Sequence, residues 1–92
     1  RSSTFRMRRR LNLVGPQVSK ARNKLGWTQD TLARELQLLG WDVSRSSVGK
    51  LESGLRWVSD CELVFLARAL RCDLRDLFPR HLDYRKLGDE FR

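Results

Sequence analysis

Hydroxyl groups and cations are concentrated in one short stretch of the chain, SRSSVGKLE at residues 44–52. Serine hydroxyls both donate and accept hydrogen bonds, while the side chains of Arg45 and Lys50 donate them and carry a positive charge. Only Val48 and Leu51 in this stretch are apolar, so a helix built from it would offer a core only a narrow stripe. The remaining side chains are therefore free to bind a polar or anionic partner.

The net charge of +8 is distributed unevenly along the 92 residues. Residues 1–10 hold five arginines and no acidic residue, and residues 11–58 hold seven basic and four acidic residues. Residues 59–92 balance seven basic with seven acidic residues. All of the excess therefore lies in the part of the chain that contains the stretch above. This favours a polyanionic partner there, with a surface that serves only solubility as the alternative.

The residue patterns typical of enzymes, metal centres and membrane spans are absent from the sequence. The single histidine, His81, has no companion at metal-ligand spacing and no nearby triad partners, and no glycine-rich phosphate loop is present. No apolar run approaches the ~20 residues that span a bilayer. Cys61 and Cys72 are too far apart for a disulfide if one helix carries both. We therefore expect no catalytic residue, metal, cofactor or membrane contact, a cytoplasmic location, and a core position for Cys61.

Capped helix starts recur along the chain. Thr28, Ser44, Ser59 and Asp73 each precede a helical pattern, and apolar residues flank each start in the spacing of a hydrophobic staple. A first helix begins at Pro16, where a missing N–H is tolerated. The predicted helices are 16–25, 29–39, 44–54, 60–71 and 74–78. Since no alternating run indicates a strand, we predict one all-α domain of five helices.

Two segments of this series resemble the helix-turn-helix of the lambda repressor and Cro-like family, also called the xenobiotic-response-element (XRE) family. They are TQDTLARELQ at 28–37 and VSRSSVGKLESG at 43–54, and the likeness extends through VSKARNKLGW before them and residues 58–78 after them. The resemblance implies a lambda-repressor-like fold and a DNA-binding transcription regulator. The implied organisation is a basic N-terminal arm at 1–14, the helix-turn-helix domain at 15–79 and a C-terminal tail at 80–92.

The resemblance also implies that helix 44–54 enters the major groove of double-stranded DNA. The base-reading positions of the family pattern fall on Ser44, Arg45, Ser46, Gly49 and Lys50. Arg45 is the first candidate for a paired contact with a guanine, and Lys50 is the second. Gly49 departs from the pattern, which usually has a side chain there. It either lets the helix approach the bases closely or removes one reader.

Positions that contact the sugar-phosphate backbone in the family fall on residues around this helix: Thr28, Gln29, Ser53, Arg56 and Trp57. Trp57 is explained equally well as a lid on the core. In the arm, Arg8, Arg9 and Arg10 either reach into an adjacent minor groove or only add nonspecific affinity. Arg22 and Glu52 match a pair that forms an ion pair between the first and third helices in relatives, so we expect them to be structural.

The turn between the second and third helices is the main departure from the family pattern. Relatives typically make this turn with a single glycine, whereas six residues, QLLGWD at 37–42, stand here. We expect its first three residues to lengthen the second helix and Gly40 to end it. Leu38 and Trp41 then either pack against the outer side of the two helices or form part of a contact surface.

A repressor that binds an inverted-repeat operator as a homodimer is the function that the resemblance favours, and such a protein would be associated with the nucleoid. One recognition helix reads only a few base pairs, and a second copy doubles the site. The alternative is a protein-interaction module of the same fold, such as the antitoxin of a toxin–antitoxin pair. A protein partner would contact the tail at 79–92 or the insertion at 37–42. RNA binding is a weaker option, because the sequence offers no sheet with stacking aromatic residues.

Overall fold

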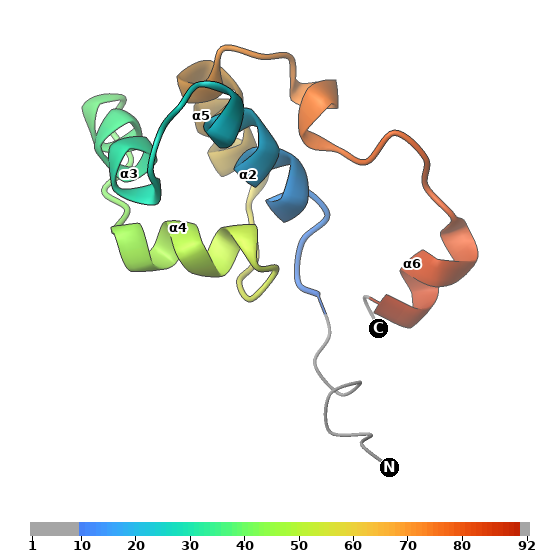
Figure 1. Ribbon diagram of the computed structural model, residues 1–92. Helices are drawn as coiled ribbons and strands as arrows, with labels where there is room; N and C mark the ends of the chain where they lie inside the picture. The colour runs from blue at the N-terminus through green and yellow to red at the C-terminus, as the bar shows by residue number, and fades with distance from the viewer. Residues whose placement is uncertain (1–9, 91–92) are drawn as a thin grey trace.

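The computed structural model describes residues 10–90 and consists of helices joined by short loops (Figure 1). The elements are α2 (Gly15–Lys24), α3 (Gln29–Leu38), α4 (Arg45–Glu52), α5 (Asp60–Leu70), the 3₁₀ helix η1 (Leu74–Leu77) and α6 (Tyr84–Glu90). No strand occurs in this part of the chain. The predicted all-α class and the order of the five predicted helices are confirmed. The fifth of them is a single 3₁₀ turn, and the tail adds α6.

The starts of α3, α4 and α5 use the side chains that the sequence predicted as caps, which are Thr28, Ser44 and Ser59. The Oγ atom of Ser44 accepts the main-chain N–H of Ser47 at 3.0 Å, which holds the first turn of α4. At the start of α5, Ser59 and Glu62 each accept the main-chain N–H of the other, at 3.2 and 3.0 Å. Each such cap stabilises a helix by about 1 kcal/mol. The start of α4 is therefore fixed locally, although this helix buries only two side chains.

Gly40 ends α3, as predicted, in a left-handed conformation with φ of 111°. The main-chain N–H of the next residue, Trp41, donates to the oxygen of Leu36 at 3.0 Å, which is the bond that closes a Schellman motif. Gly54 repeats this arrangement after α4, with φ of 77°. Because a Cβ atom disfavours these φ values, glycine sets the point at which each helix stops.

Two buried side chains and one close backbone approach attach α4 to the rest of the domain. Val48 and Leu51 are 1% and 0% exposed. A Cβ atom on Gly15, at the start of α2, would lie 2.6 Å from the main-chain oxygen of Leu51. Only glycine permits α2 to pack so closely on the end of α4. The apolar residues of the core are Val14, Val18, Leu32, Ala33, Leu36, Val43, Val48, Leu51, Leu66, Ala67, Ala69, Leu70 and Leu77.

The folded domain begins before the predicted boundary between arm and domain. Asn12 is 6% exposed, and its Nδ2 atom donates to the main-chain oxygens of Leu51 at 3.0 Å and Arg56 at 2.9 Å. Its Oδ1 atom accepts the N–H of Gly15 at 2.8 Å. Val14 is 2% exposed and belongs to the core. The residues directly before α2 are therefore part of the domain, because they bind the end of α4.

The inserted residues between α3 and α4 run towards α5. The main-chain oxygen of Val43 accepts a hydrogen bond from Nε2 of Gln37 at 2.7 Å, which closes the turn. The ring of Trp41 lies 6.0 Å from that of Phe65 in α5, measured between centroids. Leu38, in contrast, is 75% exposed. Trp41 therefore has a place in the packing, whereas Leu38 remains at the surface.

Both cysteines are free, and neither belongs to the buried core. Cys61 is exposed on α5, so the expected core position is wrong. It lies one turn from Val64, which is 57% exposed, on the side of the helix that faces away from the core. Cys72 is half-buried, and burial together with the charges of Asp76 and Asp73 raises the pKa of its thiol.

The described residues were compared with the requirements of a membrane-spanning helix and of a metal site. Every helix within residues 10–90 falls short of the length and apolar character that crossing a bilayer would require. Among the side chains that the structure describes, no three or more histidine, cysteine, aspartate or glutamate residues are grouped so that they could hold a metal ion.

Candidate nucleic-acid interface

The outward side of α4 carries exposed cations and small side chains. Arg45, Ser46 and Lys50 are exposed, while Val48 and Leu51 face the core on the opposite side. Among the described residues, neither Arg45 nor Lys50 has an ion pair or a hydrogen bond through its side chain. The DNA major groove, about 12 Å wide, admits a helix. This side of α4 therefore offers two free cations and little bulk to a polyanion.

Ser44 differs from the other predicted base readers because its hydroxyl is already engaged. Besides accepting the N–H of Ser47, its Oγ atom donates to the Oγ atom of Ser47 at 3.2 Å. Both hydrogen bonds lie within the first turn of α4. Ser44 thus serves the start of the helix, whereas Arg45 and Ser46 point their side chains outward without such partners in the described part of the chain.

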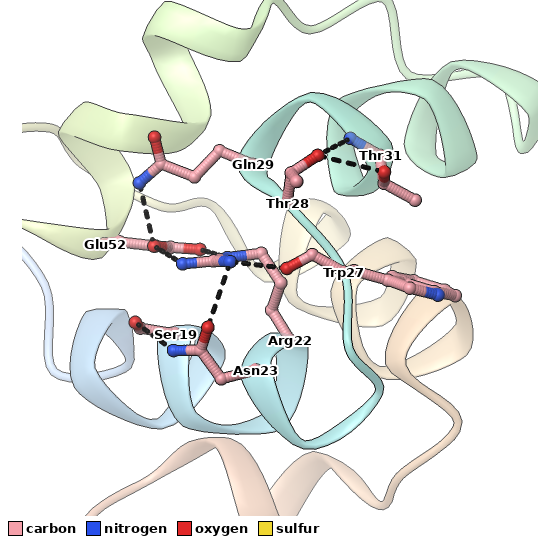
Figure 2. A network of polar contacts seen from close by, with 8 residues as sticks. All are labelled: Ser19, Arg22, Asn23, Trp27, Thr28, Gln29, Thr31 and Glu52. Carbon is pink, nitrogen blue, oxygen red and sulfur yellow. Dashed lines mark hydrogen bonds and ion pairs between the residues drawn. The ribbon is translucent and has the colours of Figure 1, made fainter.

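Arg22 holds Glu52 at the end of α4, as the sequence predicted (Figure 2). The Nε atom of Arg22 lies 2.7 Å from Oε2 of Glu52, and its Nη2 atom lies 3.1 Å from Oε1. The Nη1 atom donates to the main-chain oxygen of Trp27 at 2.6 Å. The side chains of Arg22 and Glu52 are only 11% and 6% exposed. The pair therefore ties α4 to α2 and neutralises the one carboxylate of α4.

The amide of Gln29 contacts α4 instead of extending from the start of α3 into solvent. Its Nε2 atom donates to Oε1 of Glu52 at 3.0 Å (Figure 2). A Cβ atom on Gly49 would lie 3.5 Å from Oε1 of Gln29, an ordinary van der Waals distance. The Gln29 side chain therefore lies over the position that Gly49 leaves empty. Gly49 itself is half-buried. This burial does not fit the prediction that residue 49 contacts a base directly.

Three of the predicted backbone-contacting residues lie at the surface around α4. Thr28 caps α3, and its Oγ1 atom accepts the N–H of Thr31 at 3.0 Å. Ser53 and Trp57 follow α4 and are exposed, and Trp57 is 67% accessible. An indole exposed to this extent does not cover the core, so the interpretation of Trp57 as a lid is wrong. All three side chains are accessible to a ligand bound on α4.

Arg56 is bound within the domain, which does not fit its predicted contact with the DNA backbone. Its Nη2 atom lies 3.2 Å from Oε2 of Glu62, and its guanidinium lies 5.6 Å from the centre of the Trp41 ring. The side chain is 28% exposed, and its Nη1 atom is buried without a hydrogen-bond partner. We therefore interpret Arg56 as a structural residue that fastens the insertion to the start of α5.

The described part of the basic arm lies beside the end of α4. A Cβ atom on Gly54 would lie 3.3 Å from the Cζ atom of Arg10, so this guanidinium covers the glycine. The N–H of Leu11 donates to the main-chain oxygen of Gly54 at 2.8 Å. Arg8 and Arg9 lie outside the described residues. The cationic head of Arg10 therefore lies against the glycine that ends α4.

Asn12 and Gly15 position α4, but the sequence interpretation did not identify either residue. Together they bring the start of α2 against the last carbonyl groups of α4. A local signal was present, since an asparagine three residues before a Gly–Pro helix start is well placed to accept an N–H there. The second role of Asn12 is to donate a hydrogen bond to Leu51 in α4, 39 residues later, and no neighbouring residue in the sequence indicates this contact.

Comparisons with known proteins agree with this geometry. A family model described as helix-turn-helix matches residues 18–77, which run from within α2 to the end of η1. Among solved structures, the chain is similar to the restriction-modification controller protein C.AhdI from Aeromonas hydrophila, known from a high-resolution crystal structure. The two are 35% identical with a TM-score of 0.64, and the match covers 74% of this chain and 96% of that chain. No curated protein matches the sequence significantly.

Proposed function

This chain belongs to the XRE-type helix-turn-helix family of DNA-binding transcription regulators, and we propose that it reads a specific operator by placing α4 in the major groove. The observation that carries the proposal is the exposed face of α4. Arg45 and Lys50 project from it without acidic partners among the described residues, while Val48 and Leu51 hold the other side in the core. A helix attached in this way can enter a groove without disturbing the domain.

Within this proposal, Arg45 makes a paired contact with a guanine, and Ser46 and Lys50 contact neighbouring positions of the same groove. Residues at the edges of α4 bind phosphates and set its register: Thr28, Ser53, Trp57 and the arm arginines Arg8, Arg9 and Arg10. Support for this assignment comes from the exposure of Thr28, Ser53 and Trp57, and from Arg10 lying against the end of α4. Phosphate contacts fix orientation, and base contacts supply the sequence preference.

We further propose that the protein acts as a homodimer on an inverted repeat and represses transcription. Two-fold symmetry would place the half-sites roughly 34 Å apart, one turn of DNA. A surface for the second copy is available on α5 and η1, where Val64 and Leu74 are 57% and 46% exposed. In Figure 1, α4 lies below α3 and α5 in the view, and η1 (orange) lies at the top. Association there leaves both copies of α4 free for DNA.

The similarity to a restriction-modification controller protein makes the genes of such a system the first targets to test. Repression of genes on a bacterial or phage chromosome also places the protein in the cytoplasm with the nucleoid. The exposure of Leu38 in the insertion and Tyr84 in α6, which are 75% and 79% accessible, favours a protein contact as the second candidate function. In that case the domain would act as an antitoxin-like module.

An electrophoretic titration against duplex DNA at two salt concentrations separates the two functions. A reader that makes about 4–6 phosphate contacts per copy should lose affinity steeply with salt, with a slope of about −0.9 in log–log form for each contact. A module that binds only proteins would give no specific duplex complex at either concentration. The dimer is tested separately by the mass of the free protein in sedimentation, compared with that of a Val64→Glu variant.

A further inference from the structure

We propose that Gln29, which the family pattern assigns to a phosphate, reads an adenine, and that Glu52 fixes its amide for this task. This inference rests on the function proposed above, because it assumes that α4 lies in the major groove. It assigns a base reader to α3, and it explains why position 49 can be a glycine. Three features of the structure carry it: a fixed carboxylate, an oriented amide and an empty side-chain position.

The carboxylate of Glu52 is fixed before Gln29 reaches it. Two nitrogens of Arg22 hold its two oxygens at 2.7 and 3.1 Å, and a third nitrogen of Arg22 is bound to the main-chain oxygen of Trp27 at 2.6 Å. The Glu52 side chain is 6% exposed, so water has little access to it. Both oxygens of this carboxylate face N–H donors of Arg22, so the carboxylate acts here as a hydrogen-bond acceptor.

The orientation of the Gln29 amide follows from this chemistry. Because Glu52 acts as an acceptor, the NH₂ group of Gln29 must face it, at 3.0 Å from Oε1, and the amide oxygen must face away. Figure 2 shows Glu52 on the side of the Gln29 nitrogen opposite to the amide oxygen. The amide oxygen and the second N–H beside it therefore remain unused, since no described residue hydrogen-bonds to them.

Gly49 provides the space in which this free edge lies. Arg45, Gly49 and Glu52 are spaced four and three residues apart, so they form one row along α4. The Gln29 oxygen lies 3.5 Å, and its Cδ and Nε2 atoms 3.9 Å, from the point where a Cβ atom of residue 49 would be. The amide of Gln29 thus takes the place in this row that a side chain on residue 49 would fill.

An oxygen acceptor beside an N–H donor is the arrangement that matches the N6 and N7 atoms of adenine in the major groove. A phosphate offers acceptors only, so it could pair with the second N–H of Gln29 but would leave the outward amide oxygen without a donor. A base edge is therefore the better partner for this side chain than the DNA backbone. The orientation is maintained before binding, so little side-chain freedom remains to be lost in the complex.

The experiment is selection of binding sites from a random duplex library by the wild-type protein and by Gln29→Ala. The matched control is Gln17→Ala, a half-buried glutamine in the first turn of α2. We expect Gln29→Ala to lose a preference for adenine at one position per half-site and to bind the wild-type site about 10- to 100-fold more weakly. The affinity of Gln29→Ala for random DNA should be unchanged. Gln17→Ala should select the same binding sites as the wild-type protein.

Each other outcome has a distinct meaning. If Gln29→Ala weakens the selected site and random DNA equally and keeps every base preference, Gln29 contacts a phosphate and the inference is wrong. If Glu52→Gln, which allows either amide orientation, retains the adenine preference, Glu52 has no orienting role. Failure of the wild-type protein to enrich any sequence would instead overturn the proposed function, independently of Gln29.

Discussion

The side-chain amide of Asn12 donates a hydrogen bond to the main-chain oxygen of Leu51, 39 residues later, at 3.0 Å. This bond joins the segment before α2 to the last turn of α4, and a second bond from the same nitrogen reaches the oxygen of Arg56 at 2.9 Å. The Asn12 side chain therefore links the start of the domain to α4, the helix that we propose reads DNA.

We expect Asn12→Ala to lower the free energy of unfolding by about 2–3 kcal/mol, because buried main-chain groups would lose their partners. Urea unfolding followed by circular dichroism measures the change. Asn12→Asp is the matched variant, since it retains the oxygen that accepts the N–H of Gly15 but cannot donate to either carbonyl group. If Asn12→Ala lowers the free energy of unfolding by less than about 0.5 kcal/mol, the size of a surface substitution, the hydrogen bonds of Asn12 do not stabilise the domain.

Removing the partner of Arg22 should also destabilise the domain. In Glu52→Ala the side chain of Arg22, which is 11% exposed, would lose its bidentate carboxylate and keep only weaker partners. We expect a loss of roughly 2–4 kcal/mol, with a lower melting temperature. Thermal unfolding of Glu52→Ala, Arg22→Met and the double variant gives the coupling of the two residues. An unchanged melting temperature in Glu52→Ala would contradict a stabilising role for the pair.

Two glycine-to-alanine substitutions should act in opposite directions. In Gly15→Ala the new Cβ atom would lie 2.6 and 2.7 Å from the main-chain oxygens of Leu51 and Glu52, which cannot move aside without shifting α4. We expect a loss of about 1–3 kcal/mol, as for other overpacked sites. In Gly49→Ala the nearest atom, Oε1 of Gln29, is at 3.5 Å, so the gain in helix propensity of about 1 kcal/mol should remain.

Denaturant titrations of Gly15→Ala and Gly49→Ala on the same day allow a direct comparison of the two signs. If both variants are destabilised to the same extent, the close approach of α2 to α4 is not what selects glycine at position 15, and a general intolerance of glycine replacement in this domain would be the simpler explanation.

Local chemistry explains how much of this architecture could be predicted from the sequence. Ser44 and Ser59 cap helices because a hydroxyl accepts an N–H a few residues later, and Gly40 ends a helix because of its own backbone freedom. The contact between Arg22 and Glu52 could be predicted because the family pattern carries both positions. In each case the information lies within a few residues or in the order of the motifs.

The features that could not be predicted depend on the path of the chain in three dimensions. The family pattern assigns Arg56 to the DNA backbone, but its binding to Trp41 and Glu62 depends on the path of the insertion, which that pattern lacks. The orientation of Gln29 depends on a carboxylate from another helix. The expected core position of Cys61 is wrong because the apolar composition of α5 does not indicate which side of the helix faces outward.

The exposed face of α4 is the feature on which the proposed function depends most directly. Arg45 projects from this face, has no acidic partner among the described residues and buries nothing in the core. Replacing it should therefore leave the fold intact and affect only the bound state. Circular dichroism of Arg45→Ala should match that of the wild-type protein, and this provides the control for binding measurements.

The most direct test is the affinity of Arg45→Ala for a selected duplex and for random duplex DNA at one salt concentration. We predict a loss of about 1–3 kcal/mol on the selected site, relaxed preference at a single base position and little change on random DNA. Equal weakening on both duplexes, or none on either, would contradict the claim that this face of α4 reads bases.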